Sequence, residues 1–298
     1  MYKRQLNAST ADGYNPYRIT RSGIDWEVAD PHDPWSYIGY WGDHQIIYLL
    51  KLLEHLERHE PEELRGMLKR EIFAYANVPY RIKPYEKVLE NPKDTVAFDQ
   101  DEEERIRLRV QTRGSDGKLI WKKNGQVRLV NLAEKLLVPL LAKLSNFIPG
   151  AGIWLNTQRP EWNDANNALV GNGASMVTLY YLRRYLTFCQ ELLGSTQDQS
   201  FKLSAEVAEF FSAVMRTLEG HRGLLARDIS DPQRKRIVDD LGRAGSEYRC
   251  LIYQKGFSAR TATVSKQQLV DFLATALDWT NHSIQSNRRG DGLYHAYN

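Results

Sequence analysis

The feature that most constrains this chain is a succession of apolar residues at helical spacing, interrupted by long polar loops. Between positions 129 and 147, for example, leucines recur every four residues, at Leu132, Leu136, Leu140 and Leu144. Residues at that spacing share one face of an α-helix. Comparable patterns predict seven long helices, at 43–58, 61–72, 129–147, 174–193, 204–218, 231–255 and 265–286. We therefore expect a mainly α-helical fold.

The connections suggest how these helices pair. Helix starts are marked by the Asp231-Pro232 dipeptide and by Ser265 followed by Gln268, the pattern of a capping box. No repeat of fixed period is present, which argues against an array of short helical repeats. Long helices joined in this way favour stacked helical hairpins.

The stretch 78–127 has a different character. It contains three prolines, an acidic run at 99–104 and a turn signal at 115–117 between segments of alternating polarity. Alternation on both sides of a turn predicts a β-hairpin, so we expect a small β-containing insertion near 95–127. A run of like charges usually forms a solvated face, and we assign the acidic run that role.

Charge and composition narrow the classes of partner. Forty Lys and Arg oppose 37 Asp and Glu, a net charge of +3, too balanced for the dense positive field that binds a phosphate backbone. We therefore expect no nucleic-acid partner. No apolar run is long enough to cross a membrane, and no apolar segment at the N-terminus directs secretion, so we expect no membrane association and slightly favour the cytoplasm.

The two cysteines, Cys189 and Cys250, lie in separate predicted helices without metal-ligand or disulfide spacing. We interpret both as buried free thiols. No group of His and Cys residues has the spacing of a metal site, and we predict no catalytic metal.

The first candidate site is the loop 150–173, between two strong helices. It combines carboxylates, carboxamides and a tryptophan, at Glu161, Trp162, Asn163, Asp164, Asn166 and Asn167. Carboxamides donate and accept hydrogen bonds at once, which suits sugar hydroxyls. A tryptophan that shields a carboxyl raises its pKa toward that of a general acid. The alternative is a loop held by side-chain turns and a helix cap.

The second candidate site is the aromatic-rich loop 12–42 and the helix start that follows. Its candidate sugar-binding residues are Trp35, Tyr40, Trp41, Asp43 and His44. Aromatic faces stack on sugar rings as readily as they fill a core. Asp43 can equally serve as the N-cap of the helix, and a loop histidine such as His44 more often has a structural role.

The segment Glu161-Trp162-Asn163-Asp164 resembles a loop of the cellobiose phosphorylase family and of glycogen-debranching glucosidase domains. This resemblance to the six-hairpin (α/α)6-barrel glycosidases implies that Asp164 protonates the glycosidic oxygen. The stretch leading to Asp43 is similar to the loop with which those enzymes hold the nonreducing sugar. This chain has Trp41-Gly42 where that family has an aromatic residue and an arginine, so the resemblance leaves its sugar specificity open.

The resemblance implies a carbohydrate-active enzyme without a cofactor, acting on an oligosaccharide or polysaccharide, with phosphate as a possible second substrate. It extends over 12–298, and we expect 1–11 to lie outside the folded domain. A complete barrel has twelve helices and seven are predicted, so we expect a partial barrel and a fragment of a larger protein. The rival interpretation is a noncatalytic helical sugar-binding or scaffold module.

Hydrolysis and phosphorolysis are both open. An inverting hydrolase needs a second carboxylate as base, whereas a phosphorylase needs none because phosphate attacks the sugar. The candidates for a second carboxylate are Glu161, Asp25, Glu27 and Asp291.

The aromatic residues of the two loops generate a first test. If Trp35, Trp41 and Trp162 line one cleft, then a bound sugar ring changes their environment. We expect glucose-type oligosaccharides to quench tryptophan fluorescence in a saturable manner, measured by titration. Fluorescence that no glycan changes would contradict a shared cleft.

Overall fold

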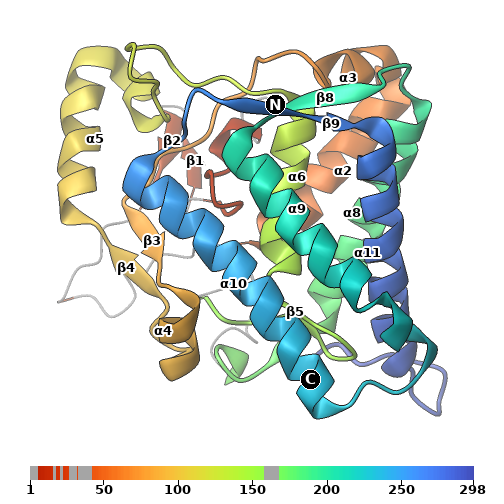
Figure 1. Ribbon diagram of the computed structural model, residues 1–298. Helices are drawn as coiled ribbons and strands as arrows, with labels where there is room; N and C mark the ends of the chain where they lie inside the picture. The colour runs from red at the N-terminus through yellow and green to blue at the C-terminus, as the bar shows by residue number, and fades with distance from the viewer. Residues whose placement is uncertain (1–5, 16–17, 21–22, 27–31, 33–41, 158–167) are drawn as a thin grey trace.

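The computed structural model describes residues 6–15, 18–20, 23–26, 32, 42–157 and 168–298 (Figure 1). This part of the chain is mainly α-helical, as the apolar spacing predicts, and carries small antiparallel sheets. The longer helices are α2 (Asp43–His59), α5 (Gln100–Arg113), α6 (Leu132–Leu144), α8 (Met176–Ser195), α9 (Ala205–Gly220), α10 (Asp231–Lys255) and α11 (Lys266–Ser286).

The predicted helices are confirmed to within a few residues at each end, with one exception. The helix predicted at 61–72 is the short α3 (Pro61–Met67): Leu68 is buried, but the chain after it leaves the helix through the exposed residues 69–71 before Phe73 enters the core. The expected capping box is also confirmed: Gln268 N donates to Ser265 Oγ at 3.1 Å, and Ser265 N donates to Gln268 Oε1 at 2.9 Å.

Helix α6 is the centre of the fold. All of its residues are buried, and it contacts α2, α8, α9 and α10. Around it the helices follow one another in space as α2, α8, α11, α9 and α10, each packed on the next (Figure 1). A helix that is apolar on every side can be accommodated only in this way, surrounded by other elements.

The charges on α6 are buried together with its leucines, and each has a partner. Lys135 Nζ donates to Ala74 O at 2.7 Å and to Ser9 O at 3.3 Å, and lies 4.0 Å from the centre of the Tyr75 ring. Burial lowers the pKa of Lys135 well below its usual range. Because an unpartnered buried charge is strongly destabilising, these contacts fix which segments lie against the helix.

The sheets are short and antiparallel. Their strands are β1 (Arg18–Thr20) with β2 (Gly23–Asp25), β3 (Tyr80–Ile82) with β4 (Val96–Phe98), β5 (Phe147–Ile148) with β6 (Gly152–Trp154) and β7 (Ala174–Ser175), and β8 (Ser200–Ser204) with β9 (Thr261–Ser265). The longest ladder, β8–β9, pairs Ser204 with Thr261 and Ser200 with Ser265. Since β8 leads into α9 and β9 into α11, this ladder holds the starts of two long helices together.

The insertion at 78–127 is less β-rich than predicted. Strand β4 is present and pairs with β3, but no hairpin forms around 115–117: the residues from Gln100 to Arg113 form α5, and Gly114–Lys118 form a 3-10 turn. The short helix α4 (Tyr85–Glu90) lies between the two strands. The acidic run begins α5, where Asp99 Oδ1 accepts from Glu102 N at 3.0 Å as an N-cap.

The described residues before position 12 belong to the folded chain, contrary to our expectation for 1–11. Leu6 and Ala8 are fully buried, and Ala76 N donates to Ser9 O at 3.0 Å. Their burial beside α6 supplies one of the two carbonyl acceptors of Lys135.

The cysteines provide a test of the packing. Cys189 is buried as predicted, whereas Cys250 is only half-buried. Burial raises the pKa of the Cys189 thiol to about 12, and only the thiolate attacks disulfide reagents. In a Cys250→Ser variant at pH 8, we expect Cys189 to react with a chromogenic disulfide reagent only after denaturant is added. Equal rates before and after unfolding would contradict the burial.

Candidate functional site

Most of the predicted site residues lie outside the described part of the chain. They are Trp35, Tyr40, Trp41, Glu161, Trp162, Asn163, Asp164, Asn166 and Asn167, together with Glu27 among the alternative carboxylates. Asp43 and His44 lie in the first turn of α2. What the structure does describe is the residues at both ends of the two loops, and these show where the loops are anchored.

The first loop starts from a buried tyrosine. Tyr14 is 1% exposed, and its hydroxyl accepts a hydrogen bond from Asn146 Nδ2 at 3.1 Å. Lys143 Nζ lies 5.5 Å from the centre of the Tyr14 ring. Burial raises the pKa of Tyr14, so the hydroxyl stays protonated and holds a fixed place at the end of α6.

The C-terminal end of the loop 12–42 is hydrogen-bonded to the residue that follows Tyr14. Gln45, in the first turn of α2, is fully buried, and its Nε2 donates to Asn15 Oδ1. No described residue donates to Gln45 Oε1. The loop that begins after Asn15 and ends before α2 is therefore closed at its base by two carboxamides.

Asn146 joins the first loop to the second. It follows α6, and besides donating to Tyr14 it accepts from Asn156 Nδ2 at 2.8 Å. Its backbone carbonyl also accepts from Trp154 N at 2.8 Å. One buried side chain thus contacts the start of both predicted site loops. We call the three residues Tyr14, Asn146 and Asn156 the Asn146 junction.

The closing segment of the chain lies where the second loop ends. Asn298 and Ala174 exchange backbone hydrogen bonds of 2.8 and 2.9 Å, and Asn298 Nδ2 donates to Ala151 O at 2.7 Å. The closing residues 296–298 are therefore packed against β7 at the entry to α8. Asp291, one of the alternative carboxylates, forms an ion pair with Arg289 at 2.7 Å.

Asp43 does not cap α2. Gly42 occupies the N-cap position without a side-chain cap hydrogen bond, and Asp43 is the first residue of the helix. Its side chain is 4% exposed, and a negative charge in the first turn interacts favourably with the helix dipole. The alternative carboxylate Asp25 is half-buried, 3.5 Å from Lys118 Nζ. Asp43 and Gln45 together place a carboxylate and a carboxamide at the base of the first loop.

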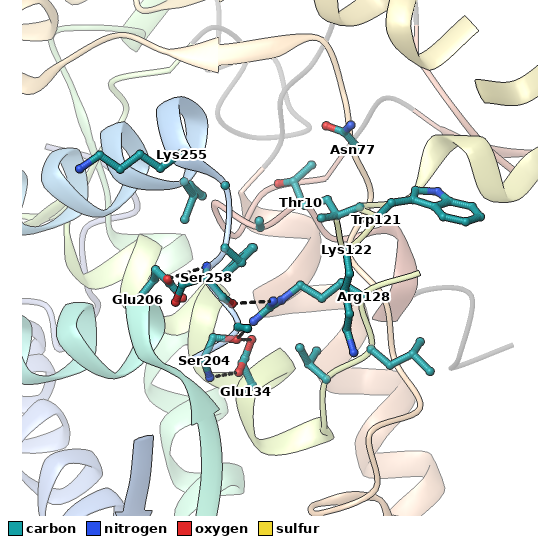
Figure 2. Close-up of a pocket in the computed structure, with 18 of the residues that line it drawn as sticks. Thr10, Asn77, Trp121, Lys122, Arg128, Glu134, Ser204, Glu206, Lys255 and Ser258 are labelled. Atoms are coloured by element: carbon teal, nitrogen blue, oxygen red, sulfur yellow. Dashed lines mark hydrogen bonds between the residues drawn. The ribbon is translucent and has the colours of Figure 1, made fainter. Parts of the chain in front are cut away.

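A large pocket lies at the opposite end of α6, and sequence reasoning did not predict it (Figure 2). Its volume is about 1050 Å³, and it is lined by residues of the segments 10–12, 120–131, 202–206 and 251–261, among others. Asn131 and Glu134 at the start of α6 line it, whereas Asn146 follows the end of that helix. At 1.5 Å per residue, about 18 Å of helix separates Glu134 from Asn146, whereas on another side the pocket reaches Thr10, whose hydroxyl donates to Tyr14 O of the junction at 3.0 Å.

A hydrogen-bond network forms the floor of this pocket (Figure 2). Arg128 donates to Ser204 Oγ at 2.7 Å and to Ser258 O at 3.2 Å, and Ser204 in turn donates from N and Oγ to Glu134 at 2.6 and 2.9 Å. Glu206 Oε1 accepts from Ser258 N at 2.8 Å. Burial raises the pKa of Glu134. We call this cavity the Arg128 pocket.

Comparison with known proteins gives no family: the sequence matches no family model and no curated protein. Within the ranges that the structure describes, no three His, Cys, Asp or Glu side chains gather as a metal site. None of the helices among those residues combines the length and apolarity needed to span a bilayer.

The Asn146 junction can be tested through stability. Replacing Asn146 by Leu keeps its size but leaves the Tyr14 hydroxyl without its donor and Asn156 without its acceptor. A buried polar group that loses its partner costs about 1–3 kcal/mol, so we expect the free energy of unfolding to fall by about that amount in urea titrations. Gln285→Leu, on the exposed face of α11, is the control. If both variants unfold at the same urea concentration, the junction does not hold the loops.

Proposed function

We propose that this chain is part of an (α/α)-barrel enzyme that cleaves glycosidic bonds, with Asp164 as its general acid. The observation that carries the proposal is the Asn146 junction, because it ties the described ends of both candidate loops to one buried carboxamide. Two loops anchored at one place can present their side chains to one substrate.

Cleavage of a glycosidic bond requires that both loops contact the same substrate. A general acid must lie within hydrogen-bond reach of the glycosidic oxygen, while the sugar on one side of that bond has to be held in position. In this proposal the loop 150–173 supplies the acid and the loop 12–42 supplies the sugar-binding residues. Asp43 and the fully buried Gln45 lie in the first turn of α2, directly after the sugar-binding loop 12–42, and both side chains contain oxygen atoms that can accept hydrogen bonds.

The helical architecture supports the same class of enzyme. The described chain is mainly helical, and its helices α2, α8, α11, α9 and α10 pack around the buried α6, so the support from the fold is its helical class and not a closed ring of hairpins. The junction follows the C-terminal end of α6, and β7 and the closing segment 294–298 lie beside the exit of the second loop.

In the proposed reaction Asp164 donates its proton to the glycosidic oxygen as the bond to the anomeric carbon breaks. Trp162 shields that carboxyl from water, which raises its pKa and keeps it protonated until it reacts. Asn163, Asn166 and Asn167 bind hydroxyl groups of the substrate. In a hydrolase, water attacks the anomeric carbon and gives a proton to a second carboxylate that acts as base, whereas in a phosphorylase phosphate attacks that carbon directly.

The acid is tested by Asp164→Asn, which preserves size but removes the transferable proton. We expect turnover of unactivated glycans to fall about 10²- to 10⁴-fold, measured by release of reducing sugar with and without phosphate. Glycosides with a good leaving group need less protonation and should lose much less activity.

Glu161→Gln is the companion variant, because it removes the other carboxylate of the same loop, which is a candidate for the base. Near wild-type turnover by Asp164→Asn, together with loss in Glu161→Gln, would transfer the role to Glu161. A protein that binds glycans but cleaves none would instead indicate a noncatalytic sugar-binding module.

A further inference from the structure

We propose that the Arg128 pocket binds an acidic oligosaccharide, in which some sugar rings carry a carboxylate and others only hydroxyl groups. Its floor lies at the other end of α6 from the Asn146 junction, and of the proposed catalytic loops only the first residue, Asp12, lines it. The inference rests on the charges and hydrogen-bonding groups that line the pocket, and it holds or fails independently of Asp164.

The pocket holds an excess of positive charge. Eight Lys or Arg residues line it against five Asp or Glu residues. This excess of three equals the net charge of +3 of the entire chain. The other charges of the chain sum to zero, and the pocket lining carries a positive excess that attracts an anion.

Its acidic residues are largely engaged within the protein. Glu71 lies 3.5 Å from Lys202 Nζ, and Glu102 accepts from Arg109 at 3.0 Å. Asp12 accepts from the hydroxyl of Tyr253. These carboxylates consequently repel an incoming anion less than their number suggests.

Several of the basic residues, in contrast, have no acidic partner. Within the described part of the chain, no carboxylate lies within 4 Å of Lys122, Lys123, Lys255 or Arg260. The first two follow Trp121, which lies on one side of the pocket, while Lys255 points away from Arg128 (Figure 2). Lys122, Lys123 and Arg260 are exposed and can attract the carboxylates of a ligand.

The floor holds one donor and one acceptor that no described residue pairs with, both just beneath the surface, where a ligand reaches them once the side chains above them turn aside. Arg128 is 8% exposed and Glu206 is 4% exposed, and neither Arg128 Nε nor Glu206 Oε2 has a hydrogen-bond partner among the described residues. A buried polar atom without a partner is costly. A hydroxyl group satisfies both kinds of atom, because it donates and accepts at once.

This combination selects the ligand class. A nucleic acid carries a charge at every phosphate, and Glu134 and Glu206 on the floor would oppose that density. A neutral glycan would use the floor but leave the exposed lysines unsatisfied. A glycan with occasional carboxylates matches both, and a volume of about 1050 Å³ is large enough for several sugar rings.

The test compares ligands that differ in one property. We would titrate the protein by calorimetry with a tetramer in which glucuronic acid alternates with a neutral sugar, with the neutral tetramer made from it by reducing its carboxyl groups to alcohols, and with a short oligouridylate. We expect the acidic tetramer to bind at least about tenfold more tightly than the neutral one, with an affinity that falls as salt screens the charges. Asp164→Asn should bind it as the wild type does, so failure of the catalytic proposal leaves this result unchanged.

Matched variants locate the site. Lys122→Gln with Lys123→Gln should weaken binding roughly three- to tenfold, whereas Arg216→Gln with Arg236→Gln, which removes two exposed charges elsewhere, should not. Glu206→Gln can keep the bond to Ser258 N while turning the free acceptor into a donor, and should weaken binding about tenfold. Glu209→Gln, on the exposed side of the same helix, is its control, and melting temperatures establish that each variant is folded.

Three results would overturn the proposal. Equal binding of the neutral and acidic tetramers would mean that charge is not recognised. Tight binding of the oligouridylate without binding of either tetramer would identify a nucleic-acid site. Absence of binding to all three, or binding that the Lys122 and Lys123 substitutions leave unchanged, would mean that the pocket does not hold an acidic glycan.

Discussion

The complete burial of α6 is the constraint on which the rest of the structure depends. A helix buried on every side removes Glu134, Lys135 and Lys143 from water along with its leucines, and each charge requires a partner. Lys135 donates hydrogen bonds to the carbonyl oxygens of Ser9 and Ala74, while Glu134 accepts from Ser204 at the end of β8. The helix therefore organises polar contacts at its two ends as well as the apolar core around its middle.

This explains why two separate polar regions flank one apolar helix. The Arg128 pocket begins at the N-terminal end of α6, and the Asn146 junction follows its C-terminal end. A stiff, fully packed helix sets a fixed distance between the two regions. A long glycan chain held in the pocket and one cleaved at the loops would thus meet the protein at places whose spacing does not vary.

The helices were predictable because their apolar residues recur on one face, a property of each segment alone. Helix α5 was not, because Ile106 is its only buried residue. Its stability comes instead from the Asp99 cap and from ion pairs one turn apart, such as Glu102 with Arg105 and Glu104 with Arg107. The turn signal at 115–117 was real, but it follows a helix rather than joining two strands.

The residues of the candidate sites were likewise predictable only where they are close together in the sequence. Clusters such as Glu161 to Asn167 are visible in the sequence because they are local, whereas no pattern shows that Tyr14 and Asn156 meet at Asn146. The Arg128 pocket was missed altogether, since Arg128, Ser204 and Ser258 come from distant segments and none belongs to a motif. Only the packing of the chain around α6 brings such residues together.

The β8–β9 ladder has a consequence for how the chain folds. It joins Ser204 to Thr261, so the whole α9–α10 hairpin is a loop closed by that ladder. Closing a long flexible loop is entropically unfavourable, but α9 and α10 pack directly on each other and shorten it once they have paired. We therefore expect the α9–α10 hairpin to form before the β8–β9 ladder. Formation of the ladder is then expected to position α11 against α8.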